Sequence, residues 1–86
     1  MLQIMYAPHF VRQFKRLPTE LQNEAIEKIE ILRHTSNHTS LKVHKLHGRF
    51  SRCFSFSVNF KTRIVFEYVS KKEVALLAIG DHRIYG

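Results

Sequence analysis

The sequence predicts a single α+β domain spanning residues 1–86, in which a mainly antiparallel sheet of about four strands carries helices on one face. Three observations predict this class. A chain of 86 residues is long enough for one hydrophobic core but not for two. Apolar residues recur every three to four positions in the first half of the chain and alternate in the second half. A hydrophobic content of 44% with only three Gly and two Pro is typical of a folded protein.

The first half is expected to form one strand and an antiparallel helical hairpin. Residues 2–6 alternate and end before Pro8, which indicates a short strand followed by a helix that Pro8 opens. The apolar face of this helix consists of Phe10, Phe14 and Leu17. Pro18 breaks it and begins a second helix that closes with Arg33 and His34, where basic side chains favour a helix end. The apolar face of the second helix consists of Leu21, Ala25, Ile29 and Leu32.

The second half is expected to form three further strands. A polar loop at residues 35–40 leaves the second helix. Alternation then predicts strands at 53–58 and 63–68, joined by a turn at 59–61, and the apolar run 74–79 suits a central strand. The helices would cover one face of the sheet, which leaves the other face free for function. The positions that point to the free face include Cys53, Ser55, Ser57 and Arg63.

The charge of the chain points to a polyanionic partner. Fourteen Lys and Arg against seven Asp and Glu give a net charge of +7, which sets up a strong positive field on so short a chain. The simpler alternative is a basic protein that its charge merely keeps soluble.

The single cysteine and the short apolar start indicate a cytoplasmic protein. Cys53 is the only cysteine, so neither an intrachain disulfide nor a four-thiolate metal site can form, and a reducing compartment fits. The apolar stretch at residues 1–6 is too short for a signal-peptide core or a membrane span. We therefore expect the cytoplasm and no contact with a membrane.

Three segments could together form a basic groove on the free face. The first is Arg63, which lies within an apolar run. The second is a basic stretch comprising Lys42, His44, Lys45, His47, Arg49 and Arg52. The third follows Gly80 and comprises Asp81, His82, Arg83 and Tyr85. Lys and Arg would bind phosphates, His would transfer protons and Tyr would stack on a base.

Each segment also has a simpler interpretation. The basic stretch could be a solvated strand and loop. Arg63 could form a salt bridge with Glu67 on the same strand face, and Tyr85 could seal a sheet edge. The pairs His44/His47 and His34/His38 make a metal conceivable, but neither pair is well aligned and no carboxylate cluster completes a site. We therefore predict no metal and no other cofactor.

Several blocks of the sequence resemble the RelE family of toxins within the RelE/ParE superfamily, closest to its YafQ-like branch. They are LKVHKLHG at 41–48, RIVFEY at 63–68 and LLAIGDHRIY at 76–85. The opening strand and the FKRLP junction at 14–18 also match, so the resemblance spans nearly the whole chain. The order and spacing of these blocks are more specific than any one of them.

The resemblance implies the toxin of a type II toxin–antitoxin system, a metal-independent endoribonuclease that cleaves mRNA in the ribosomal A site and so inhibits translation. Its partners would be an antitoxin protein, mRNA and ribosomal RNA. By position, Arg63 would hold the scissile phosphate, His82 would protonate the leaving oxygen, Tyr85 would orient the RNA and His44 could act as base. The residues expected to bind flanking RNA are Lys42, Lys45, Arg49, Arg52 and Arg83.

The sequence departs from the family pattern on the sheet face. Ser55 and Ser57 stand where the best-known RelE enzymes place two lysines, and the sheet His of the YafQ-like branch is absent, which leaves the general base open. Two other functions therefore compete with the nuclease. One is a ParE-like inhibitor of DNA gyrase, and the other is a basic module that binds RNA without cutting it. The ending from His82 to Tyr85 favours the nuclease.

Overall fold

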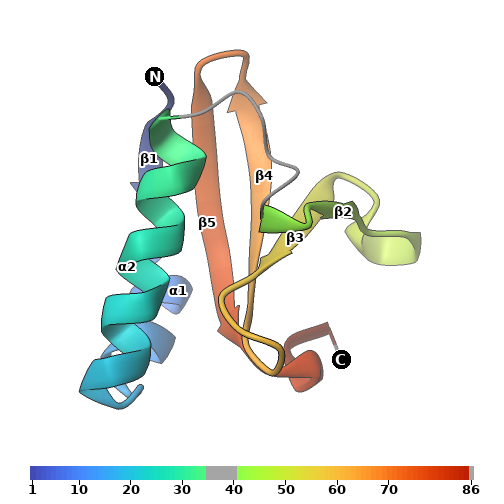
Figure 1. The fold of residues 1–86 in the computed structure, drawn as a ribbon. Helices are drawn as coiled ribbons and strands as arrows, with labels where there is room; N and C mark the ends of the chain where they lie inside the picture. The colour runs from blue at the N-terminus through green and yellow to red at the C-terminus, as the bar shows by residue number, and fades with distance from the viewer. Residues whose placement is uncertain (35–40, 86) are drawn as a thin grey trace.

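The computed structural model describes residues 1–34 and 41–85, except for the side chains of Arg49 and Tyr85. The predicted loop at 35–40 lies outside the described residues. In chain order the elements are β1 (Gln3–Tyr6), α1 (Pro8–Lys15), α2 (Thr19–His34), β2 (His44–Lys45), β3 (Cys53–Ser57), β4 (Arg63–Ser70) and β5 (Glu73–Gly80). Two short 3-10 helices, η2 (Gly48–Phe50) and η3 (His82–Tyr85), precede β3 and follow β5 (Figure 1).

The strands form one sheet in the order β1-β5-β4-β3-β2. Strands β2 to β5 pair antiparallel with their neighbours, whereas β1 pairs parallel with β5. The predicted α+β class with a mainly antiparallel sheet is confirmed, although the sheet has five strands because His44 and Lys45 add a short edge strand. Strand β5 lies between β1 and β4, which agrees with the interior position that its apolar run predicted.

The helical hairpin begins at Pro8 and turns at Pro18, as the sequence predicted. Pro8 occupies the first turn of α1, where its missing N–H costs no hydrogen bond. The side-chain amide of Gln22, in the first turns of α2, donates to the carbonyl oxygens of Phe14 at 3.0 Å and Leu17 at 3.2 Å. These two bonds tie the end of α1 to the start of α2. In residues 1–34 and 41–85, no helix is long and apolar enough to cross a membrane.

Both helices pack on the same face of the sheet, and the core lies between them and the strands (Figure 1). The buried helix residues are Phe10, Ala25, Ile29 and Leu32. The buried strand residues on this face include Phe56, Val58, Ile64, Phe66, Val74, Leu76 and Ile79. The rings of Phe56 and Phe66, both 0% exposed, meet edge to face at 5.6 Å. Burial of one such side chain contributes about 1.5–3 kcal/mol, so this face supplies most of the stability.

Helix α1 also fixes the end of β5. Strand β1 accompanies β5 only as far as the pair Tyr6 and Leu76, after which the chain turns into α1. Beyond that point the Gln13 side-chain oxygen accepts a hydrogen bond of 2.9 Å from the Ile79 backbone N–H, and thus replaces the missing strand. An unpaired backbone N–H in this half-buried position would be costly. The last residues of β5, which lead into η3, are therefore held in place.

Candidate active site

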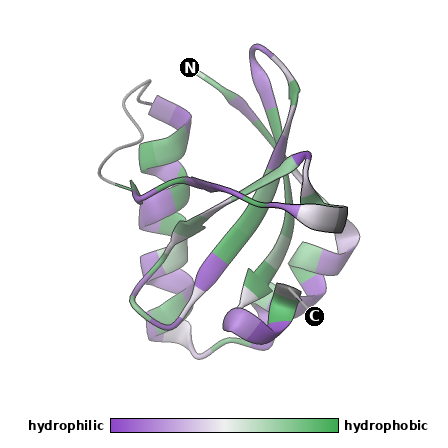
Figure 2. Cartoon of the chain, turned by 90° about the vertical axis from the view of Figure 1, so that its right-hand side faces the viewer, coloured by the Kyte–Doolittle hydropathy of each residue, from purple (hydrophilic) through white to green (hydrophobic). Residues whose placement is uncertain are grey.

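Residues from three separate segments lie on the sheet face opposite the helices. The register pairs Ser57 with Arg63 and Arg63 with Gly80, so these three residues form one row across the sheet. A neighbouring row begins at His44, which pairs with Ser55. Cross-strand partners point to the same face. In Figure 2 this face is turned toward the viewer, and the segments around β2 and the start of η3 are hydrophilic. The register thus places His44, Arg63 and the end of β5 that leads to His82 on one face of the sheet.

The Arg63 side chain is positioned by an uncharged neighbour, Ser57, which leaves its positive charge without neutralisation. Its Nη1 donates a hydrogen bond of 2.8 Å to the Ser57 hydroxyl oxygen on the adjacent strand. The suggested salt bridge with Glu67 does not form, because four residues along a strand span about 13 Å and Glu67 pairs with Cys53 instead. Within the described residues no carboxylate contacts Arg63. The half-buried guanidinium therefore keeps donors for an incoming phosphate.

The segment after β5 is a tight turn that Asp81 stabilises. The Asp81 carboxylate accepts hydrogen bonds from the Arg83 backbone N–H and Nε at 2.9 Å, and its other oxygen lies 2.8 Å from the Arg83 Nη2. These side-chain and backbone hydrogen bonds lower the pKa of Asp81 to about 2, and they raise the pKa of Arg83. Asp81 thus binds Arg83 rather than the ring of His82. His82 begins η3 and is exposed to solvent.

Gly80 lets η3 fold back against the end of β5. A Cβ atom at this position would lie 2.5 Å from the Ile84 Cγ2, which is closer than two carbons can approach. Any larger residue here would therefore force Ile84 to move. Because Gly80 also pairs with Arg63, the same residue sets the position of η3 relative to the guanidinium.

The predicted RNA-binding residues separate into two groups. Lys45 pairs with Phe54 and so points to the opposite face from His44. Lys45 and Arg52 line a hollow of about 560 Å³ with Ser51, Phe54, Glu67, Tyr68 and Val69. This hollow lies at the start of β3, whereas Arg63 and Arg83 lie at the other end of the sheet. Lys42 is exposed, with φ at 55°. The side chains of Arg49 and Tyr85 lie outside the described part of the chain.

The two serines on this face differ. Ser55 is only 2% exposed, so it cannot meet an RNA in solvent, whereas Ser57 is half-buried and binds Arg63. Burial also raises the pKa of Cys53, with a further contribution from Glu67. The sequence indicated that Ser57 stands where RelE enzymes have a lysine, but it did not predict the hydrogen bond between Ser57 and Arg63. The tight turn at 59–61 carried that signal, because a hairpin closed there places residues 57 and 63 opposite each other.

No metal centre forms among the residues whose positions are described. Within residues 1–34 and 41–85, no three side chains of His, Cys, Asp or Glu lie close enough together to hold a metal ion. His38, one member of the His34/His38 pair, falls in the segment that the structure does not describe. The chemistry that the described segments offer is therefore a guanidinium at Arg63 and imidazoles at His44 and His82.

The order of the strands, the helical hairpin on one face and the open opposite face match the fold of solved structures that include RelE, YoeB and YafQ. The YoeB–YefM complex from Staphylococcus aureus matches with a TM-score of 0.76 at 16% identity, over 95% of this chain and 98% of the other. The archaeal RelE–RelB complex from Pyrococcus horikoshii matches with a TM-score of 0.74 at 15% identity, over 93% of both chains.

YafQ from Escherichia coli is a third solved structure with the same fold. It matches with a TM-score of 0.72 at 13% identity, over 99% of this chain and 98% of the other. At these identities the likeness shows a shared fold over almost the full length. Comparison with protein-family models gives no match, and neither does comparison with curated protein sequences.

Proposed function

We propose that this protein is the toxin of a type II toxin–antitoxin system and that it cleaves mRNA on the ribosome in the cytoplasm. The main support for the proposal is the row of Ser57, Arg63 and Gly80. It places the Arg63 guanidinium, which no described carboxylate contacts, next to the start of η3. His44 on the same face and His82 in η3 supply two imidazoles, side chains that can serve as general base and general acid. The shared fold with the RelE, YoeB and YafQ structures supports the same assignment.

The proposed reaction is an internal transfer within the RNA. The 2′-oxygen of one nucleotide attacks the adjacent phosphorus while the bond from phosphorus to the 5′-oxygen breaks. His44 accepts the proton of the 2′-hydroxyl, and His82 gives a proton to the leaving 5′-oxygen. Arg63 binds the phosphate and the charge that develops on it. The products are a 2′,3′-cyclic phosphate and a 5′-hydroxyl, with no water consumed and no metal required. The side chain of Tyr85 would orient the RNA.

The proposed reaction depends on the ribosome because the toxin has few groups with which to activate the 2′-hydroxyl alone. Ser55 is buried and the Ser57 hydroxyl is engaged by Arg63, so neither replaces the lysines of other RelE enzymes. Orientation of the reacting groups can lower a barrier by up to roughly 7–11 kcal/mol. The ribosome would supply that orientation by holding the mRNA in the A site. Lys42, Lys45, Arg49, Arg52 and Arg83 would bind flanking mRNA or ribosomal RNA.

An antitoxin is the proposed protein partner. The YoeB and RelE structures are complexes with YefM and RelB, respectively. For this chain we expect an extended or helical antitoxin segment to cover the basic groove, so binding should weaken as salt is added. A complex in which Arg63 and His82 stay open to solvent would contradict this mode of neutralisation.

The decisive experiment is single-turnover cleavage on ribosomes programmed with a defined mRNA, with mapping of the 5′ ends and assay of the cyclic phosphate. We expect site-specific cuts with ribosomes and almost none on naked mRNA. Arg63→Ala should abolish both cleavage and phosphate binding, and Arg12→Ala, which removes an exposed arginine of α1, serves as the matched control. Efficient cutting of naked mRNA would refute the ribosome dependence. Inhibition of gyrase supercoiling without any RNA cleavage would identify a gyrase inhibitor instead.

A further inference from the structure

The turn between β3 and β4 is rigid and presents one aromatic ring to solvent. Asn59 Oδ1 accepts hydrogen bonds from the backbone N–H groups of Lys61 at 2.9 Å and Thr62 at 2.8 Å. The Val58 N–H donates to the Thr62 carbonyl oxygen at 2.8 Å. An asparagine side chain that caps its own turn in this way fixes the backbone. Residues 58–62, which we call the hairpin tip, therefore hold Phe60 in one place.

Phe60 differs from every other phenylalanine in the chain. Its residue is 85% exposed, whereas the other six are buried or half-buried. Single exposed apolar residues are common and usually mean little. Here, however, the ring is paired with a cation, because the Lys61 Nζ lies 5.8 Å from its centre. A planar ring and an ammonium group side by side match the two parts of a nucleotide, the base and the phosphate.

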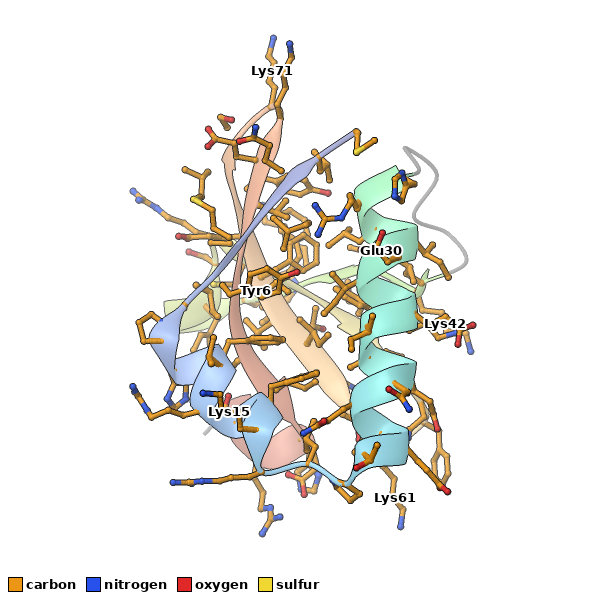
Figure 3. The ribbon with its side chains drawn as sticks, turned by 90° about the vertical axis from the view of Figure 1, so that its left-hand side faces the viewer. Tyr6, Lys15, Glu30, Lys42, Lys61 and Lys71 are labelled. Atoms are coloured by element: carbon orange, nitrogen blue, oxygen red, sulfur yellow. The ribbon has the colours of Figure 1, made fainter. Side chains whose placement is uncertain are left out.

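The hairpin tip lies at the same end of the sheet as the candidate active site. Figure 1 shows the β3–β4 turn beside η3. Lys61 and Thr62 line one hollow of about 500 Å³ together with Gly80, Asp81, Arg83 and Ile84 from the η3 side, and with Gln13, Leu17, Leu21 and Ile79. Phe60 lies three positions before Arg63 in the sequence, so their Cα atoms are no more than about 11 Å apart. Figure 3 shows Lys61 at the opposite end of the molecule from Lys71.

The charges near the hairpin tip favour an anion. Asp81 is the only acidic residue lining this hollow, and its carboxylate is already engaged by Arg83. Lys61 pairs with no carboxylate among the described residues. A strand of RNA that placed one phosphate at Arg63 could thus continue over Lys61 without meeting a free negative charge.

We propose that the hairpin tip is an RNA-binding element in which Phe60 stacks on an unpaired base that flanks the cleaved phosphate, while Lys61 contacts the backbone of that nucleotide. Stacking on an aromatic ring is tolerant of sequence, because every base has a flat face. The element would therefore contribute affinity and position, and would leave codon choice to other contacts. The inference rests on the proposed function, because it assumes that the phosphate at Arg63 belongs to RNA.

The first test measures stacking directly, without any need for cleavage. A short single-stranded RNA carrying 2-aminopurine loses fluorescence when its base stacks. We expect the wild-type protein to quench it and Phe60→Ala to bind the RNA about 5- to 150-fold more weakly. Phe60→Trp should restore binding, Phe60→Leu should not, and Ile26→Ala, at an exposed apolar residue of α2, should match the wild type. Absence of quenching by the wild type, or full binding by Phe60→Leu, would overturn the proposal.

The second test separates this inference from the nuclease itself. On programmed ribosomes, Phe60→Ala should raise the toxin concentration needed for half-maximal cleavage and change the rate at saturation by less than about twofold. If the variant cleaves with an unchanged concentration dependence, the hairpin-tip proposal fails and the nuclease stands. If the wild type cleaves nothing yet stacks on the oligonucleotide through Phe60, the nuclease fails and the hairpin-tip proposal stands. Weaker antitoxin binding with unchanged RNA binding would make Phe60 a protein contact and overturn the proposal.

Discussion

The two faces of the sheet are built from alternate residues of the same strands, yet they have opposite properties. Phe56 and Ile64 point to the helices and are fully buried. Their neighbours Ser57 and Arg63 point the other way and meet each other through a hydrogen bond. The helix-covered face is apolar and closely packed, whereas the open face holds a charge that no described carboxylate contacts. Residues one position apart therefore serve different purposes, stability on one face and proposed chemistry on the other.

The acidic residues are distributed in the same uneven way. Four of the seven acids lie on α2, all exposed, and they are Glu20, Glu24, Glu27 and Glu30. Some of this charge is used locally, since Glu30 pairs with both Arg33 and His34. The negative charge thus gathers on the helix side of the molecule, so the net charge of +7 is carried mainly by the rest of the surface. A polyanion would be attracted toward the side away from α2.

The largest effect should come from the open face and should leave the fold intact. His82→Ala is expected to slow the chemical step by roughly 100- to 10,000-fold, because it removes the proposed proton donor. Ribosome binding and the melting temperature should barely change, since His82 is exposed. Single-turnover cleavage on programmed ribosomes, together with a melting curve, measures both. His9→Ala, at an exposed histidine of α1, is the control.

Two other outcomes for His82 are informative. A loss of melting temperature together with activity would mean that His82 only fixes the end of the chain against the sheet. A stable variant that cleaves at the wild-type rate would remove His82 from the mechanism and would leave His44 or Lys45 to be tested as proton donor. Arg63→Ala should differ in kind, because it should also weaken binding of the scissile phosphate.

On the helix-covered face we expect the reverse, a substitution that lowers stability and leaves the rate of the chemical step unchanged. Phe66→Ala should lower the free energy of unfolding by about 3–5 kcal/mol, because it leaves a cavity where the ring meets Phe54, Phe56 and Tyr68. The fraction of molecules that remains folded should still cleave at the normal rate. Denaturant titration gives the stability, and activity is scaled to the folded fraction. A loss below about 1 kcal/mol would contradict the division between the faces.

Gly80→Ala should affect both properties at once, because this residue joins the sheet to η3. A Cβ here meets Ile84 Cγ2, so we expect η3 to shift and stability to fall by about 1–3 kcal/mol. Cleavage should fall because His82 moves with η3. The double variant Gly80→Ala/Ile84→Ala removes the clashing methyl group and should recover activity relative to Gly80→Ala. An equal loss in both variants would show that the clash is not the cause.

The smallest expected effect is a loss of the Asp81–Arg83 interaction at low pH. Because the folded-state pKa of Asp81 is about 2, below the ordinary value of 3.8, its contribution to the η3 turn is present above pH 4 and is lost as the pH falls through about 2. The turn should therefore survive mild acid. An NMR titration of the Asp81 carboxyl carbon and the Arg83 Nε–H signal follows this directly, and Asp81→Asn should abolish the transition. A midpoint near 4 would mean that the ion pair does not persist in solution.

Local patterns predicted the elements that are long enough to show a period. The faces of α1 and α2 and the alternation in β3 and β4 reappear in the structure, as does the interior place of β5. A strand within the basic stretch was only the simpler alternative there, and the 3-10 helices were not foreseen, because two to four residues cannot display a repeat. The parallel pairing of β1 with β5 was also missed, since contacts between distant segments leave no local signature.

For the candidate site, the sequence identified the residue types but not their partners. It placed Arg63 on the free face, and the register confirms that position. It offered Glu67 as a partner of Arg63, and this pairing is wrong because Arg63 binds Ser57. Side chains choose partners across strands and within tight turns, and those choices depend on register and on backbone angles that residue order alone does not fix.

The parallel pairing of β1 with β5 also has a consequence for how the chain is made. Gln3 lies beside Glu73, so β1 can dock only after β5 has left the ribosome. Contacts this distant in sequence are slow to form, because a long loop must close before they stabilise anything. The row that contains Gly80 would be completed at the same late stage. Under the proposed function, the candidate site would therefore be assembled late, after β1 to β4 have already left the ribosome.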